Sequence, residues 1–144
     1  MSAACVFCAI VSGSSTAHVV LDTAECVAFL DVKPLFRGHV LVVPREHVVT
    51  LPELGEVAPN AIGPLFSHVA RIAKAVTTAL HAEGSFVAIN NVVSQSVPHL
   101  HVHVVPRTKG DGLKGFFWPR TKYPDDAAMA DVAATLRAAL ETDR

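Results

Sequence analysis

Three histidines alternate with aliphatic residues in the segment from residue 99 to residue 105, which reads His-Leu-His-Val-His-Val-Val. This alternation has the period of a β-strand, so we expect the imidazoles of His99, His101 and His103 on one face and the aliphatic side chains on the other. Imidazole has an unperturbed pKa near neutrality, and it can therefore transfer protons, act as a nucleophile or bind a metal ion. The segment thus predicts a catalytic or metal site, with a solvated strand face that is rich in histidine as the plainer alternative.

A single metal ion cannot bind all three histidines if the segment is a regular strand. At a rise of about 3.3 Å per residue, His99 and His103 lie about 13 Å apart, whereas zinc binds a ring nitrogen at about 2.0 Å. A pair such as His99 and His101 could still share an ion. The spacing favours different roles, in which His101 acts on the substrate and its two neighbours assist it.

The segment resembles the signature of the histidine triad (HIT) superfamily of nucleotide hydrolases and transferases, in which three histidines alternate with apolar residues. It matches this signature throughout, and the resemblance extends over most of the chain. Its other parts are Cys5 to Cys8, Phe-Leu-Asp at 29–31, Arg-Gly-His-Val-Leu-Val-Val-Pro at 37–44, and Gln95-Ser96. The chain is therefore similar to bacterial Hint-like members of the superfamily.

Length and composition indicate one globular domain over residues 1–144. The chain is 51% hydrophobic and 17% charged, which is enough for a sizeable core. Its net charge of -1 provides no electrostatic footprint for duplex nucleic acid or an anionic membrane, so we expect a small-molecule partner. The N-terminal residues lack the basic region and apolar stretch that are typical of a signal peptide, there is no run of about 18 uncharged apolar residues, and the three cysteines suit a reducing compartment. These features predict a cytoplasmic protein.

Hydrophobic periodicity predicts five strands and two helices. The strands are expected over 18–21, 25–31, 39–43, 85–90 and 99–105. Apolar residues recur at three- and four-residue steps over 62–80, which predicts a long helix with Gly84 placed to cap its end. A second helix is expected over 126–140, with four apolar residues on its buried face: Met129, Val132, Leu136 and Leu140.

The order of these elements indicates an α+β domain with a mostly antiparallel sheet. The resemblance implies the HIT-like fold, in which a five-stranded sheet packs with a long central helix and a C-terminal helix follows. It also implies a homodimer that is joined through the long helix and an edge strand.

His101 is the expected nucleophile. Attack by neutral imidazole on the α-phosphorus of a nucleotide would form a nucleotidyl-histidine, which water then hydrolyses. The other ring nitrogen must be held as a donor for this attack, and Nδ1 or the main-chain oxygen of His99 is close enough to do so. His103 lies on the same face, where it could donate a hydrogen bond to a phosphate oxygen.

Residues around the triad are expected to bind the phosphates. The resemblance implies that Ser96, Gln95 and an asparagine, either Asn90 or Asn91, contact the phosphates or the leaving group, and that His39 lies behind the site. One departure stands out, because the resembling proteins commonly have a longer loop with glycine where this chain has only residues 92–94, Val-Val-Ser. Positive φ angles are costly without glycine, so we expect the backbone around the phosphates to differ here.

The nucleoside is expected near the third strand and the N-terminus. The resemblance implies that the Asp31 carboxylate binds the ribose hydroxyls and that the base is a purine. Ordinary core packing is the alternative for the four apolar residues at the positions that line the base pocket: Phe7, Ile10, Phe29 and Leu41.

The pair Cys5 and Cys8 forms a second constellation. No βαβ pattern of a thioredoxin-like redox protein surrounds the pair, so zinc is the better interpretation, and two thiolates need two further ligands for a closed tetrahedral site. The resemblance implies that His47 and His99 are these ligands of a structural zinc, with free cysteines as the alternative. The aromatic cluster Phe116 to Trp118 is expected to pack against the rest of the protein.

The leading hypothesis is a purine nucleotide hydrolase or transferase that cleaves nucleoside phosphoramidates, or related conjugates of AMP or GMP, at the α-phosphate. The chemistry itself requires no cofactor. Hydrolysis or phosphorolysis of dinucleoside polyphosphates is the enzymatic alternative. A zinc-stabilised nucleotide-binding module with little turnover is the alternative from another class, and a metal-dependent hydrolase is the least favoured.

Overall fold

The computed structural model describes residues 4–113 and 120–143. Contacts within the chain divide it into two compact units, Met1–Asp111 and Gly112–Arg144, which we describe separately. The single domain expected over residues 1–144 stays a prediction.

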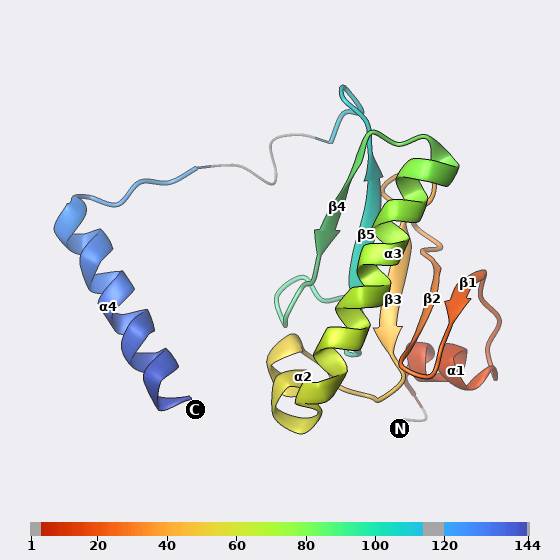
Figure 1. Ribbon diagram of the computed structural model, residues 1–144, viewed down its shortest axis with the longest axis horizontal. Coiled ribbons are helices and arrows are strands. Elements are labelled where there is room, and N and C mark those ends of the chain that lie inside the picture. The colour runs from red at the N-terminus through yellow and green to blue at the C-terminus, as the bar shows by residue number, and fades with distance from the viewer. Residues whose placement is uncertain (1–3, 114–119, 144) are drawn as a thin grey trace. The chain divides into compact units, whose positions relative to one another are not determined.

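The first unit is built on a five-stranded antiparallel sheet (Figure 1). Its strand order is β1-β2-β3-β5-β4, so β1 and β4 form the two edges. This confirms the α+β class and the five expected strands. The strands are β1 (Val19–Asp22), β2 (Cys26–Leu30), β3 (Val40–Pro44), β4 (Gly84–Ala88) and β5 (Val102–Arg107).

Strand β5 begins three residues later than expected. Its ladder with β3 starts at the pair Val42 and Val102, so His99 and His101 precede the strand. The backbone of this preceding segment bonds elsewhere, because the Leu100 N–H donates to the Val48 carbonyl oxygen at 2.7 Å. The first two triad histidines therefore lie where the chain enters the sheet.

Helix α3 (Ile62–Leu80) has the bounds that the periodicity predicts. A short 3-10 helix, η1 (Pro59–Ala61), leads into it, and Pro59 lies in that lead-in segment. The prediction that Gly84 caps the helix is wrong. His81 ends the helix in the left-handed conformation with φ 58°, its N–H bonds to the Val76 carbonyl oxygen, and Gly84 instead begins β4.

Two short helices were not expected from the periodicity. Helix α1 (Val6–Ser12) starts at Cys5, whose Sγ accepts a hydrogen bond from the Cys8 N–H at 3.4 Å. Helix α2 (Leu51–Val57) starts at Thr50, whose hydroxyl accepts from the Glu53 N–H. Each has only 7 residues, so side-chain caps define them better than an apolar stripe does.

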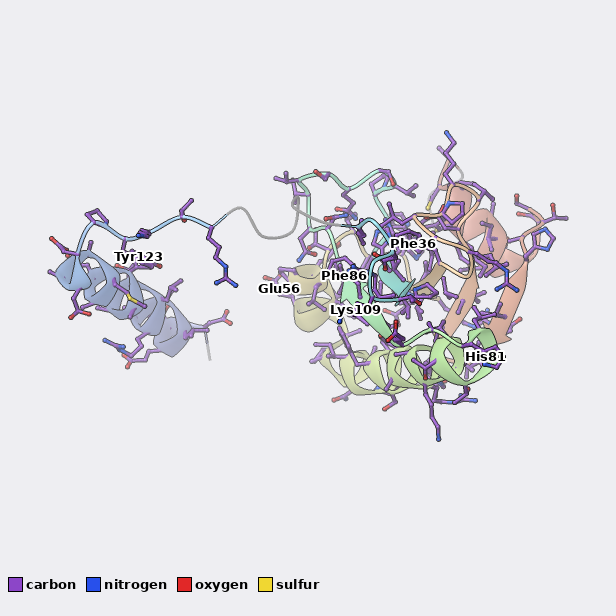
Figure 2. All side chains as sticks on the ribbon, turned by 90° about the horizontal axis from the view of Figure 1, so that it is seen from above. Phe36, Glu56, His81, Phe86, Lys109 and Tyr123 are labelled. Atoms are coloured by element: carbon purple, nitrogen blue, oxygen red, sulfur yellow. The ribbon has the colours of Figure 1, made fainter. Side chains whose placement is uncertain are left out.

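Each face of the sheet contributes residues to a cluster of buried apolar side chains. Helix α3 covers one face of the sheet, here called the α3 face (Figure 1). On this face Leu100, Val102 and Val104 pack with apolar residues of the helix, as the alternation predicts. Figure 2 shows α3 from above, with His81 at its end. On the opposite face, here called the α1 face, a second apolar cluster contains Cys5, Phe7, Cys8, Val27, Phe29, Leu41 and Val43.

The second unit contains helix α4 (Asp126–Thr142), which begins where the Asp125 carboxylate accepts a hydrogen bond from the Ala128 N–H at 2.8 Å. The prediction of a buried apolar face is wrong. The exposed fractions of its four members range from 41% for Val132 to 70% for Leu140. The physical reason is that residues 120–143 contain no second helix or strand that could cover them. Phe116 to Trp118 lie outside the described residues.

None of the helices within residues 4–113 and 120–143 is both long and apolar enough to cross a membrane. Cys5, Cys8 and Cys26 are buried and form no disulfide. The cytoplasmic location stays a prediction.

Candidate active site and metal centre

A cavity of about 470 Å³ opens on the α1 face of the sheet. It brings together eight of the residues that the sequence singles out: Phe7, Ile10, Phe29, Asp31, Leu41, Ser96, His101 and His103. Ser15, Thr16 and Lys33 also line it and were not predicted. The polar run at 14–16 is the only sequence signal for the first two, and it looks like an ordinary turn.

A second cavity of the same volume lies between α3 and the strands on the α3 face. Its lining is almost entirely aliphatic, apart from Arg37 and Arg71. It contains none of the predicted site residues.

His101 has its ring orientation fixed by the backbone. Its Nδ1 lies 2.7 Å from the main-chain oxygen of His99, and a carbonyl can only accept, so Nδ1 carries the proton. The edge of the Phe7 ring packs against the imidazole, with the centroids 5.1 Å apart. In neutral His101, Nε2 therefore holds a lone pair on a side chain that lines the cavity.

His39 and His103 form a chain of directed hydrogen bonds. The Leu35 N–H donates to Nδ1 of His39 at 3.0 Å, so the proton of neutral His39 is on Nε2. That Nε2 lies 3.0 Å from Nδ1 of His103, which must then accept. The proton of neutral His103 is consequently on Nε2, a buried atom with no hydrogen-bond partner among the described residues.

Burial keeps this pair neutral. Together with charge repulsion from the neighbouring rings of His101 and His39, it lowers the pKa of His103 to about 4, against the opposing effect of Asp31. Burial also lowers the pKa of His39, against the opposing effect of Asp31. At neutral pH, His103 thus presents an N–H donor without carrying a charge.

Asp31 lies beside this pair. One carboxylate oxygen accepts from the Lys33 N–H at 2.8 Å, and the other is 3.7 Å from Nε2 of His39. We call Asp31, His39 and His103 the carboxylate cluster. Its ligand atoms lie within 4.8 Å of one another.

The second group of converging side chains is Cys5, Cys8, His47 and His99, here called the thiol cluster, whose ligand atoms also lie within 4.8 Å of one another. Sγ of Cys8 is 3.2 Å from Nδ1 of His47, and Sγ of Cys5 is 3.5 Å from Nδ1 of His99. Nε2 of His99 lies 3.0 Å from the Pro44 carbonyl oxygen, so Nε2 carries the proton. Nδ1 of His99 is left as a lone pair that faces both thiols.

These hydrogen bonds make the two clusters differ in their suitability for binding a metal ion. Metal-binding histidines usually donate the proton of the other ring nitrogen to an oxygen, as His99 does to the Pro44 carbonyl. Burial lowers the pKa of His99, which keeps this ring neutral, as a ligand must be. In the carboxylate cluster, by contrast, the proton of His39 is on the nitrogen that faces the other members. The donor set and the tautomer fit zinc only in the thiol cluster.

The loop before the triad differs from the expectation. Asn90 and Gln95 are not among the residues that line the cavity. Gln95 Nε2 instead donates to the Val49 carbonyl oxygen at 2.7 Å, and Asn91 Oδ1 accepts from the Leu51 N–H at 2.9 Å. The loop does adopt positive φ angles without glycine, at Val92 and Ser94.

Sequence comparisons relate this chain to known proteins. The HIT domain family matches residues 12–110. The chain is 37% identical over 111 residues to an uncharacterized HIT-like protein of Mycobacterium tuberculosis, covering 76% of this chain and 75% of that protein. It is 36% identical over 122 residues to the adenosine 5'-monophosphoramidase hnt1 of Schizosaccharomyces pombe, covering 83% and 85%. It also matches the asymmetrical bis(5'-nucleosyl)-tetraphosphatase of that yeast, at 35% over 96 residues, or 65% of this chain and 51% of that protein.

Two crystal structures are similar over nearly the whole chain. SMU.412c from Streptococcus mutans UA159 has a TM-score of 0.87 and 30% identity, covering 97% of this chain and 87% of that one. A zinc-bound histidine triad family protein from Mycobacterium smegmatis has a TM-score of 0.70 and 36% identity, covering 92% and 97%.

Proposed function

The chain belongs to the HIT domain family, a family of nucleotide hydrolases, and from this premise we propose that it cleaves purine nucleoside phosphoramidates at the α-phosphate. The similarity to a yeast adenosine 5'-monophosphoramidase supports this substrate class. One observation carries the proposal. The His99 carbonyl holds the proton of His101 on Nδ1, so that Nε2 is an unprotonated nucleophile on the wall of the cavity.

The reaction would occur in two displacements. In the first, the Nε2 lone pair of His101 forms a bond to phosphorus, the bond from phosphorus to the amine nitrogen breaks, and the amine leaves with a proton taken from solvent. In the second, the oxygen of a water molecule bonds to phosphorus and gives one proton back to solvent, while the bond from phosphorus to Nε2 breaks. This releases the nucleoside monophosphate and restores His101 to its starting tautomer.

The other cavity residues would stabilise the developing charge and hold the nucleoside. The Nε2–H of His103 would donate to a non-bridging phosphate oxygen, which recovers the hydrogen bond that this buried atom lacks. Ser96 would donate at the leaving group. Asp31 would accept from the ribose hydroxyls, and the base would lie among the apolar side chains of Phe7, Ile10, Phe29 and Leu41.

Replacement of the nucleophile tests the proposal. We expect His101→Gly to lower turnover of an adenosine phosphoramidate by at least on the order of 10³-fold while AMP still binds. With the native protein, rapid quenching followed by mass spectrometry should detect one adenylyl group on His101. Turnover that survives in the folded variant would refute the mechanism, and AMP binding without turnover in the native protein would favour a binding module.

A second candidate activity is hydrolysis of dinucleoside polyphosphates, which the similarity to the tetraphosphatase supports. Both reactions would use the same attack by His101 and differ only in the leaving group. Turnover of adenosine phosphoramidate and of diadenosine tetraphosphate, measured side by side, distinguishes them. We expect the phosphoramidate to have the higher kcat/KM.

We also propose that Cys5, Cys8, His47 and His99 bind a structural zinc. The two thiols and two Nδ1 lone pairs form a complete tetrahedral donor set, and a solved relative with 36% identity is zinc-bound. Zinc would fix the position of His99, whose main-chain oxygen orients His101. It would take no part in the chemistry at phosphorus.

Finally, we propose a homodimer that forms through α3 and the edge strand β4. Each element exposes a large apolar side chain, Phe66 on α3 and Val87 on β4. Light scattering after gel filtration should give twice the mass of the chain. Charge introduced by Val87→Lys should shift the population to monomers, whereas the same change at the exposed Val32 should not.

A further inference from the structure

We propose that Gln95 is a positioning residue that holds the loop 91–95 in a conformation its sequence opposes, and so sets the position of Ser96 at the cavity. The inference rests on the proposed function. It gives Gln95 a role different from the contact with phosphate or leaving group that the resemblance implies.

The loop carries two backbone conformations that oppose its sequence. Val92 has φ 70° and Ser94 has φ 63°. A positive φ is uncommon for any residue with a Cβ, and for a β-branched residue such as valine it is a genuine outlier. Surrounding contacts must therefore hold the loop in this form.

Gln95 supplies these contacts with both ends of its amide. Oε1 accepts from the Val92 N–H at 2.9 Å, at the residue with the larger positive φ. Nε2 donates to the Val49 carbonyl oxygen at 2.7 Å. One side chain thus joins the strained residue to the segment that follows β3.

Two further hydrogen bonds run between the same segments. Asn91 Oδ1 accepts from the Leu51 N–H at 2.9 Å, and the Leu100 N–H donates to the Val48 carbonyl oxygen at 2.7 Å. The backbone of residues 48–51 therefore forms hydrogen bonds with both ends of the segment 91–100. Gln95 forms a further hydrogen bond to it from the middle of the segment, directly before Ser96.

The location of the side chain argues against direct contact with substrate. Ser96, His101 and His103 line the cavity, whereas Gln95 does not. Its amide is directed to Val92 and Val49, so its effect on the reaction must pass through the loop and reach the substrate at Ser96.

A rescue experiment tests this inference, because glycine adopts positive φ without needing a brace. We expect Gln95→Ala to lower kcat for an adenosine phosphoramidate by on the order of 10-fold, with KM little changed, since the nucleoside pocket is intact. Adding Val92→Gly should restore most of this loss. Val93→Gly is the matched control, since Val93 has no positive φ, and it should restore nothing.

Two further comparisons complete the test. In a Ser96→Ala background, Gln95→Ala should have little additional effect on kcat, because the two residues act at one point. The losses for an amine and for a polyphosphate leaving group should also stand in the same ratio for Gln95→Ala as for Ser96→Ala, because Gln95 acts through Ser96.

The inference is overturned if folded Gln95→Ala/Val92→Gly shows no rescue, if Val93→Gly rescues equally, or if the loss on Gln95→Ala depends on the leaving group differently from the loss on Ser96→Ala. Failure of the proposed function gives a different result, because the native protein would then be inactive. In that case, the melting temperatures of the same variants test the inference. Val92→Gly should raise the melting temperature of Gln95→Ala more than Val93→Gly does. An equal shift would contradict the positioning role of Gln95.

Discussion

The thiol cluster includes His99, the triad histidine before His101, and the carboxylate cluster includes His103, the one after it; each cluster contains two histidines. In the thiol cluster, the Pro44 carbonyl accepts a hydrogen bond from Nε2–H of His99, so the Nδ1 atom of His99 offers a lone pair to a metal. In the carboxylate cluster, the Leu35 N–H occupies a lone pair of His39, so its other nitrogen offers a proton to His103. A histidine ring thus offers a lone pair in one cluster and a proton in the other.

The difference shows that the backbone partner decides what a histidine can do. A carbonyl oxygen or an amide N–H at one ring nitrogen fixes the tautomer, and the tautomer fixes whether the other nitrogen donates or accepts. His101 follows the first pattern, with its proton held by the His99 carbonyl. It therefore offers its lone pair to the cavity, whereas His103 offers an N–H.

Loss of the thiol cluster should have the largest effect. We expect Cys8→Ala to abolish zinc binding and to lower the free energy of unfolding by on the order of 5 kcal/mol, because a structural zinc contributes its binding energy to folding. Metal analysis of the purified protein and urea denaturation measure the two effects.

Cys26→Ala is the matched control for this prediction. Its thiol is equally buried but lies outside the cluster, so one zinc per chain should remain. Asp31→Asn should also leave the zinc content unchanged. If Cys8→Ala still binds one zinc per chain, or if the native protein binds none, the thiol cluster is not a zinc site and the two clusters do not differ in this respect.

The second prediction concerns the hydrogen-bond chain in the carboxylate cluster. His39→Phe keeps an aromatic ring but removes the donor to Nδ1 of His103, so His103 no longer has a defined tautomer. We expect kcat for the phosphoramidate to fall by on the order of 10²-fold, with zinc content and stability toward chelators unchanged.

Steady-state kinetics with the native protein, His39→Phe and His68→Phe would measure this effect. His68 bonds to Glu25 and Thr23 away from the cavity, so its replacement should leave kcat within about 2-fold of the native value. Native kcat in folded His39→Phe would mean that His103 does not depend on His39 for its orientation.

The third prediction is a pH dependence of stability. The pKa of His103 is about 4 in the folded protein and about 6.5 in the unfolded chain. Between these values only the unfolded chain binds a proton at this residue, so the free energy of unfolding should decrease as the pH falls from 6.5 towards 4. Since water screens part of the ring, we expect a loss of about 2 kcal/mol.

Urea denaturation of the native protein and of His103→Gln at several pH values isolates this contribution. Other groups, including any zinc ligands, titrate in both proteins, so their effects cancel in the difference. The stability difference between the two proteins should shrink on acidification. A difference that is constant from pH 7 to pH 4.5 would contradict the lowered pKa.

Much of the fold could be predicted because it depends on side-chain period. The alternation at 99–105 correctly places Leu100, Val102 and Val104 on the α3 face, and the three- and four-residue steps give the bounds of α3. Helix α4 is the counterexample. Its apolar stripe is present in the sequence, but a stripe does not reveal whether anything covers it.

The candidate site divides in the same way. The resemblance could place Cys5 with His99, across most of the chain, because a family signature carries such distant relations. It could not give the tautomers, which depend on the backbone groups of Leu35 and Pro44. Nor could it reveal that Gln95 bonds to the backbone, since the side-chain amide fits a phosphate equally well.

The smallest effect on kcat is expected for Asp31, which lies in the carboxylate cluster without being essential to its hydrogen-bond chain. Its carboxylate is 3.7 Å from a histidine that burial keeps neutral, so removing the charge should change kcat by no more than about 3-fold. Asp31→Asn retains the oxygen that accepts from Lys33 but weakens the acceptor for the ribose, so KM should rise by about 10-fold. With a 2'-deoxyribose substrate this rise should largely disappear. If kcat instead falls as far as in His39→Phe while KM is unchanged, Asp31 acts through His39, and the carboxylate cluster functions as a single unit.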